Sequence, residues 1–245
     1  MADYSYLGSG KVYLRVAGAA APRLEVGNVS ALSFSIAENV IVLKDFTNQG
    51  GGTYNEVRRI DTVEVAMTMH DLSSDNLNRA LFGTSATTAA GAVTAEVQTA
   101  YKNGLVSTAR PINTASSVTV TNSAASTTYV ANTDYEVRKG GIFVLTAGAI
   151  TDAQSIKITY TGLAFDLTQA IVNSAQEYEM FFEGLNEARS GKPVLISAFR
   201  VKLGAAQNLS LIGEEFAALE VSGKILADST KGAGLSKYFT VAVAA

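Results

Sequence analysis

The sequence predicts a mainly β protein: an antiparallel β-sandwich or partial barrel with one short α-helix and an inserted small β module. Three observations predict it. Most segments alternate apolar and polar residues with period two, which is typical of strands with one buried face. A single segment has the spacing and end residues of a helix. A stretch rich in Ser, Thr, Ala and Gly interrupts the chain from about residue 84 to 128.

The regions that flank this stretch contain several predicted strands. In residues 30–37, Leu32, Phe34 and Ile36 share one face. In residues 60–70, Val63 and the apolar residues at every second position after it also share one face. Each strand therefore has one buried and one solvated face. Further strands are predicted at residues 177–189, 193–203 and 216–228, the first two joined as a hairpin by the turn at 189–192.

The predicted helix lies in "HDLSSDNLNRALFG", residues 70–83. Leu77 and Leu81 are four residues apart, so they lie on one helix face, which we expect to pack against a sheet. Gly83 is the expected C-cap. Candidate N-caps are Asp71, Ser73 and Ser74.

The domain organisation follows from the change in composition. Residues 84–162 are predicted to form an inserted β module, because small-residue segments bound it and its last third contains three short strands with Gly turns. The flanks, residues 1–83 and 163–245, are predicted to form one domain together.

Composition excludes several classes of function. The 245 residues contain no Cys and one His, His70, so thiol chemistry is excluded and zinc has almost no ligands. We expect no metal and no cofactor. The net charge of −3 does not favour binding of nucleic acid. The N-terminus does not resemble a signal peptide and no apolar run is long enough to span a bilayer, so we expect a soluble protein made in a cytoplasm.

Catalysis is not expected either. Paired carboxylates occur at Glu177/Glu179 and Glu214/Glu215, and the i, i+2 spacing of the first pair is a candidate for glycosidase chemistry, but such sites normally lie in aromatic clefts and the chain has no Trp. A Ser-His-Asp site would have to use His70, and no nucleophile elbow is present. We expect no enzyme.

The Gly-rich stretch "FTNQGGGTYNEVRR", residues 46–59, lacks the Lys that a phosphate-binding loop requires. It falls between a strand ending near residue 43 and another starting near residue 60, which predicts the tip of a long hairpin arm with charged shanks. Two interpretations stay open: a mobile surface loop, or an arm that orders on a neighbouring subunit. The residues of the predicted arm are Phe46, Gly50, Gly51, Gly52, Tyr54, Arg58 and Arg59.

Several strands combine an apolar face with a small or acidic one. A sheet of this kind can close into a barrel by joining copies of itself, which removes its exposed edges. The wet faces would then line a water-filled lumen through which DNA slides without sticking. The residues predicted to face this lumen are Ser33, Ser35, Thr62, Glu64, Glu177, Glu179 and Glu183.

The C-terminal segment "FFEGLNEARSGKPVLISAFRVKLGAAQNLSLIGEEFAALEVSGKILAD" resembles bacteriophage tail tube proteins, also called major tail proteins. "YLGSGKVYL" is similar to their opening strand, and residues 133–162 resemble a small β module of phage structural proteins. The resemblance implies hexameric rings that stack into a tube, with a continuous inner β-barrel and an arm that reaches the next ring. The implied partners are other copies of the chain and the tape measure, tail terminator and tail-tip proteins.

The resemblance also implies a location in the virion tail after assembly in the host cytoplasm, with no membrane partner. An external inserted module favours a long non-contractile tail, because it leaves little room for a close-fitting sheath. Two alternatives remain. One is the tube of a contractile tail, or of a related injection or secretion device. The other is a carbohydrate-binding or adhesin β-sandwich, which the absence of a signal peptide and of Trp disfavours.

Overall fold

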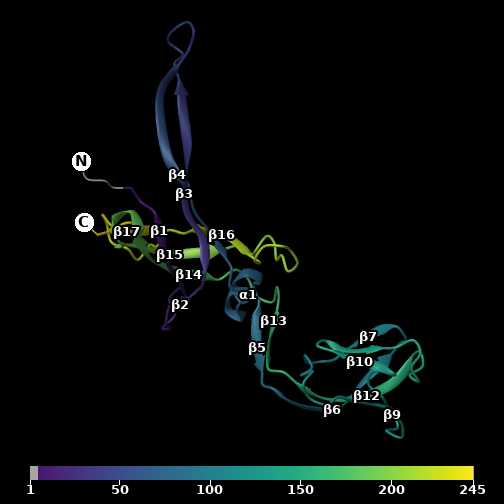
Figure 1. Cartoon of the computed structure of the whole chain (residues 1–245). Coiled ribbons are helices and arrows are strands. Elements are labelled where there is room, and N and C mark those ends of the chain that lie inside the picture. Colours follow the sequence, from purple (N-terminus) through teal and green to yellow (C-terminus); the bar gives the residue numbers. More distant parts are fainter. Residues whose placement is uncertain (1–4, 245) are drawn as a thin grey trace. The chain divides into compact units, whose positions relative to one another are not determined.

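The computed structural model describes residues 5–244, and it confirms the mainly β class with antiparallel sheets that are not closed into a barrel. The chain forms two compact units (Figure 1). The first comprises the chain up to Thr84 and from Thr168 onward, and the second comprises Ser85–Leu167. The second unit therefore ends five residues later than the predicted module. The reason is a two-stranded ribbon, β5 (Thr84–Thr88) with β13 (Phe165–Gln169), which carries the chain in and out.

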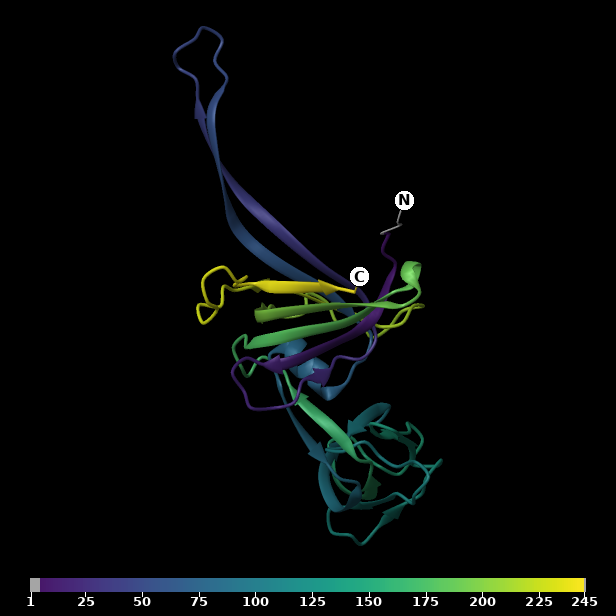
Figure 2. The same cartoon turned by 90° about the vertical axis from the view of Figure 1, so that its left-hand side faces the viewer.

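The first unit contains one eight-stranded antiparallel sheet, with strand order β2-β1-β14-β15-β16-β4-β3 and with β17 also paired to β15. One edge of β15 is divided: residues 194–198 pair with β17 and residues 201–203 pair with β16. The sheet folds over at this division into two layers, as in a sandwich (Figure 2). Its strands are β1 (Gly8–Val16), β2 (Leu24–Glu25), β3 (Val29–Lys44), β4 (Thr53–Met69), β14 (Glu177–Asn186), β15 (Lys192–Leu203), β16 (Leu219–Ile225) and β17 (Phe239–Val243).

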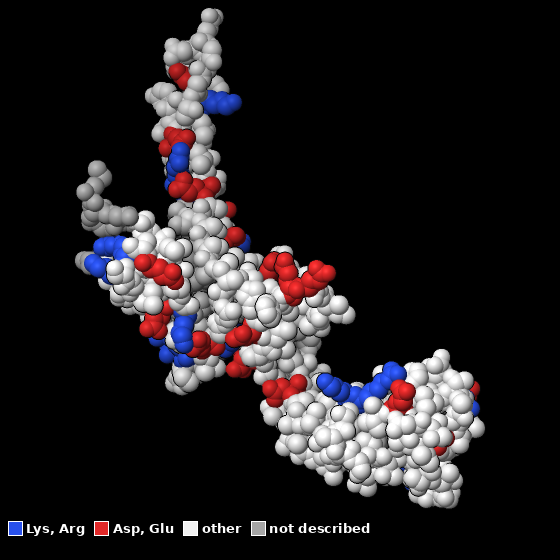
Figure 3. Space-filling view, viewed as in Figure 1, with Lys and Arg blue, Asp and Glu red and all other residues white. Residues whose placement is uncertain are grey.

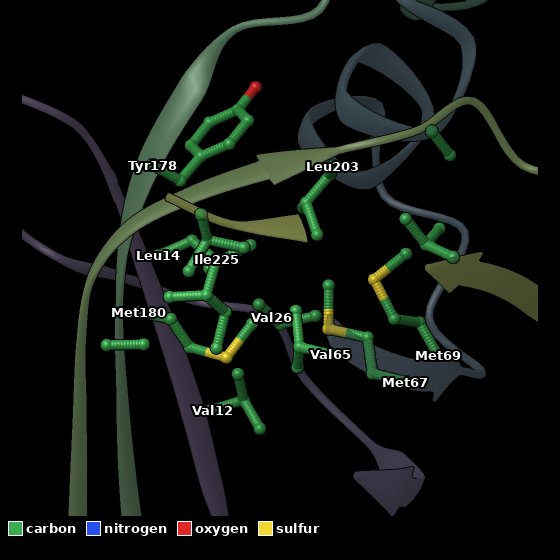
Figure 4. Close-up of a cluster of buried hydrophobic side chains, with 14 of the residues drawn as sticks. Val12, Leu14, Val26, Val65, Met67, Met69, Tyr178, Met180, Leu203 and Ile225 are labelled. Atoms are coloured by element: carbon green, nitrogen blue, oxygen red, sulfur yellow. The ribbon is translucent and has the colours of Figure 1, made fainter. Parts of the chain in front are cut away.

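The core of the first unit lies between these layers (Figure 4). Val65 and Met67 of β4 face it, as the period-two pattern predicts, and so do Tyr178 and Met180 of β14. The rings of Phe34 in β3 and Phe239 in β17 stack with their centroids 5.4 Å apart. The predicted hairpin at residues 177–203 is present as β14 and β15, with the short 3-10 helix η1 (Glu187–Arg189) in its turn.

The helix α1 (Ser74–Leu81) is N-capped by Ser73, whose side chain accepts a hydrogen bond from the Asn76 backbone N–H. The predicted C-cap was wrong by one residue: Phe82, not Gly83, adopts the left-handed conformation. Gly83 is required for a different reason. A Cβ there would lie 2.7 Å from the carbonyl oxygen of Gln169, so only glycine permits this close approach of two backbones.

The second unit has a core of its own between two small sheets, of strand order β6-β12-β8-β9 and β10-β11-β7. Buried Tyr135 donates from its hydroxyl to the Val118 carbonyl over 2.9 Å, so its polar end is satisfied. The strands are β6 (Gly91–Ala100), β7 (Gly104–Ser107), β8 (Thr119–Asn122), β9 (Thr128–Tyr129), β10 (Tyr135–Arg138), β11 (Gly141–Val144) and β12 (Gln154–Gly162). The last three are the short strands that the sequence predicts. Across residues 5–244, no helix is long and apolar enough to cross a membrane.

Candidate functional site

The most prominent feature of the first unit is an arm, formed by residues 36–61 of β3, β4 and their connection, which extends beyond the sandwich (Figure 2). It begins at a β-bulge, where the pairing shifts between Ala37 and Glu38 and leaves Asp61 without a direct partner. A bulge bends and twists a ribbon, so it marks the change from packed sheet to free ribbon. Every arm residue is exposed except Asp45, which is half-buried.

The connection at the arm tip is shorter than the sequence predicts. Strand β4 begins at Thr53, so Tyr54, Arg58 and Arg59 lie in a strand rather than in a loop. The turn is closed by a hydrogen bond of 2.9 Å from the Asp45 backbone N–H to the Gly52 carbonyl. The ladder continues to this point because both strands are rich in β-branched and aromatic residues.

The three glycines have a conformational role. Gly50, Gly51 and Gly52 have φ values of +103°, +70° and +144°, a region that other residues adopt at a cost. The Asp45 carboxylate accepts hydrogen bonds from the backbone N–H and the hydroxyl of Thr47, at 2.7 and 2.6 Å. The bond from the Thr47 hydroxyl, followed by one from the Asn48 side chain and then by that from the Thr47 N–H, lowers the pKa of Asp45. The tip therefore has a defined turn geometry in the single chain.

The arm shanks are apolar to a degree that the sequence analysis missed. Ile41 and Val57 are direct cross-strand partners, so they share a face, and their exposed fractions are 50% and 47%. Val40 and Val42 lie on the opposite face of the ribbon, so both faces expose apolar side chains. The run "VIVL" at residues 40–43 carries this signal in the sequence. The exposed large apolar residues of the arm are Ile36, Val40, Ile41, Val42, Leu43, Phe46, Tyr54, Val57 and Ile60.

Charged residues of both signs are interleaved with these apolar ones on the arm (Figure 3). Arg58 contacts Glu56 at 2.6 Å and Glu38 at 3.4 Å. The hydrogen bond and charge of Glu56, followed by those of Glu38, raise the pKa of Arg58. The arm thus offers apolar surface together with both signs of charge.

Two of the three acidic residues of β14, Glu177 and Glu179, are ion-paired. Arg200 binds Glu177 through two hydrogen bonds of 2.9 and 3.0 Å, and Glu179 is bound by both Arg15 and Arg23. The sequence pattern indicates these carboxylates but not their arginine partners, which come from other parts of the chain. This row is not the free acidic surface that the sequence analysis expects.

The third predicted carboxylate of this row, Glu183, is exposed and lies opposite Lys11 of β1. The Tyr13 hydroxyl donates to it over 3.3 Å. Its surroundings are thus mixed in charge as well, with a base directly across the ladder.

The structure does not bring the seven predicted lumen residues to one surface. Ser35 pairs with Glu64, and Ser33 and Thr62 lie on the same face of β3 and β4, opposite to their core-facing side chains. The β14 carboxylates lie on the outer side of the other layer. A channel along one side of a subunit can therefore be lined by one of these two groups but not by both.

His70 has a structural environment. Its Nδ1–H donates to the carbonyl of Ala217 over 3.3 Å, because a carbonyl can only accept, and its Nε2 then accepts from the Ser30 hydroxyl over 2.8 Å. Among residues 5–244, no group of three or more His, Cys, Asp or Glu side chains could hold a metal ion.

One known family resembles the chain over nearly its whole length. A family model described as "Protein of unknown function UCP028589" matches residues 5–242. No curated protein matches the chain.

Proposed function

The chain belongs to that family, and we propose that it is the structural subunit of a bacteriophage tail tube. In this proposal, six copies form a ring, the rings stack into a hollow tube, and DNA passes through the tube without being specifically bound. The observation that carries the proposal is the arm, a long two-stranded ribbon whose exposed apolar side chains need a partner.

The physical argument starts from the stability of the arm. An isolated two-stranded hairpin is marginally stable in water, and an exposed apolar face is typical of an interaction surface. The arm also carries Arg58 and Arg59 beside Glu38 and Glu56, so a second copy with the same charges can complement it. An arm that packs on the next ring would bury both kinds of surface.

The sandwich supports the same proposal. Strands β2 and β3 end the strand order of the sheet, so each has an edge that can pair with another copy. The segments that resemble tail tube proteins coincide with β1, with the β14–β15 hairpin and with β16, all in the first unit. In this proposal the second unit is an addition to the tube domain. On the outside of a tube it would leave little room for a sheath, which favours a non-contractile tail.

Electron microscopy of the purified, concentrated chain tests the proposal. We expect hexameric rings and tubes. The variant Ile41→Thr/Val57→Thr keeps β-branched residues in the ribbon but removes apolar surface from one face, so rings should form while long tubes are lost. The free energy of unfolding should change by less than about 0.5 kcal/mol, because both side chains are exposed.

The matched control is Val97→Thr, the same kind of change at an exposed position of the second unit. It should leave tubes intact. Tubes of normal length from the Ile41→Thr/Val57→Thr variant would show that the apolar face of the arm is not needed for the stacking of rings. A wild-type chain that stays monomeric at every concentration would overturn the proposed function as a whole.

A further inference from the structure

A second surface of the first unit is more exposed than the arm. Between β15 and β16, Leu211, Ile212 and Phe216 have exposed fractions of 69%, 96% and 94%. They lie in the apolar loop, which we define as residues 210–216 (yellow-green coil between β15 and β16 in Figure 1). Side chains of this size are rarely left so fully in water unless a partner covers them.

The base of the apolar loop is anchored on both sides. Before it, the Ala206 N–H donates to the Ala80 carbonyl over 2.7 Å, and Leu209 forms a β-bridge with Leu219. After it, the Ala217 carbonyl accepts from His70. The loop therefore projects from a fixed base, which lowers the entropic cost of presenting its apolar tip to a partner.

A groove that fits such a tip opens between the two layers of the sandwich. Its volume is about 610 Å³, within the range of pockets that bind large apolar groups. It is lined by the apolar side chains Val12, Leu32, Phe34, Phe182 and Ile196. Val243 of β17, which pairs with Val194 and is 57% exposed, also lines it.

The charges of the loop and the groove are complementary. The charged residues of the loop are Glu214 and Glu215, and the charged residue that lines the groove is Arg189. Opposite charges around an apolar contact determine its orientation and suppress wrong partners. In the single chain, the almost complete exposure of Ile212 and Phe216 means that they do not occupy the groove of their own chain.

We propose that the apolar loop of one copy inserts into the groove of a neighbouring copy, with Phe216 and Ile212 as anchors and Glu214 and Glu215 facing Arg189. The two surfaces differ, so the contact is head-to-tail, and repeated contacts of this kind close into rings or extend into filaments. This contact rests on the proposed function, because it requires more than one copy of the chain. It deepens that function by adding a contact that does not involve the arm.

The absence of native cysteine makes disulfide trapping a direct test. Full-length Phe216→Cys and Val243→Cys chains are mixed under mild oxidation and separated on a non-reducing gel. We expect a crosslinked dimer in the mixture at a level at least tenfold above that of either variant alone. The control is Ile171→Cys mixed with Val243→Cys, because Ile171 is 83% exposed but lies outside the apolar loop. It should give only background crosslinking.

Three results would overturn the inference. They are no crosslink in the mixture, a Phe216→Cys chain that crosslinks mainly with itself, and an internal disulfide in monomers of the Phe216→Cys/Val243→Cys double variant. The last result would place the loop in the groove of its own chain. A charge exchange gives an independent readout: Arg189→Glu alone and Glu214→Arg/Glu215→Arg alone should each lose the assembly, and the triple variant should regain it.

The arm variant separates this inference from the proposed function. Ile41→Thr/Val57→Thr, combined with each single cysteine, should keep the loop–groove crosslink although long tubes are lost. Normal tubes without the crosslink would overturn the groove contact and leave the proposed function standing. A crosslink in a chain that never forms rings or tubes would overturn the proposed function and leave the groove contact standing.

Discussion

At the scale of single residues, the ion pairs of β14 decide how its acidic row behaves. Arg15 lies directly across the ladder from Glu179, and Arg200 reaches Glu177 at a bulge where β15 has one extra residue. The side chains of Arg15 and Glu179 are only 27% and 23% exposed, so water screens this pair less than it screens a surface pair. The Arg15–Glu179 pair should therefore matter for stability as well as for surface charge.

Charge reversal at two positions of this row should have different effects. Glu179→Lys places a third base beside Arg15 and Arg23 and should lower the free energy of unfolding of the first unit by about 1–2 kcal/mol. Glu183→Lys changes an exposed side chain, so its effect should stay within about 0.5 kcal/mol. Urea denaturation measures both. Equal effects of the two substitutions would show that the arginine pairs contribute nothing.

At the scale of elements, the arm shows how one strand pair can change its role along its length. The part of the β3–β4 pair before the bulge packs in the sandwich, whereas beyond the bulge at Ala37 both faces of the pair are exposed. The alternating pattern at Val63, Val65 and Met67 predicts the packed part. The unbroken apolar run at residues 40–43 has no single buried face, which is the pattern of a ribbon that is covered by another molecule.

The arm turn depends on the positive φ of its glycines. Gly51→Ala adds a Cβ with no atom within 4 Å, so its cost is conformational, about 1 kcal/mol. We expect the Asp45 amide, which closes the turn, to exchange its hydrogen about fivefold faster, with the unfolding of the sandwich unchanged. Gly140→Ala is the control, because Gly140 is equally uncrowded and its φ is not positive. Unchanged exchange in Gly51→Ala would mean that the turn does not need glycine there.

At the scale of the whole molecule, the chain contains two units with separate cores. Each core is built from its own sheets, so each unit has the means to unfold cooperatively by itself. The second unit contains a buried carboxylate, Asp134, so we expect its stability to depend on acid. Asp134 accepts hydrogen bonds from the backbone N–H groups of Ala149 and Val130, at 2.7 Å each.

These two hydrogen bonds lower the pKa of Asp134 below its usual 3.8, and the bond from Ala149 has the larger effect. A lowered pKa in the folded state stabilises the unit fully above about pH 4, and this contribution is lost as the pH falls toward the folded-state value. Calorimetry should show two transitions, with that of the second unit falling below pH 4. Asp134→Asn should lower the stability of this unit at pH 7 and weaken its acid dependence. A single transition with unchanged acid dependence in Asp134→Asn would contradict this account.

Local patterns in the sequence predict the mainly β class, the β14–β15 hairpin, the division into two parts and most core-facing residues, whereas Ile36, expected on the buried face with Leu32 and Phe34, is 55% exposed because the ribbon leaves the sandwich there. These features depend on local periodicity, turn residues and composition, which short segments express directly. Which charges meet depends on the three-dimensional fold, since Arg15 and Glu179 are 164 positions apart in the chain. The fold also separates Ser35 and Glu64 from the β14 carboxylates, because the sheet folds over at β15 and their solvated faces point away from the shared core. Alternation assigns a residue to the wet side of its strand, whereas the direction of that side depends on how distant strands pair.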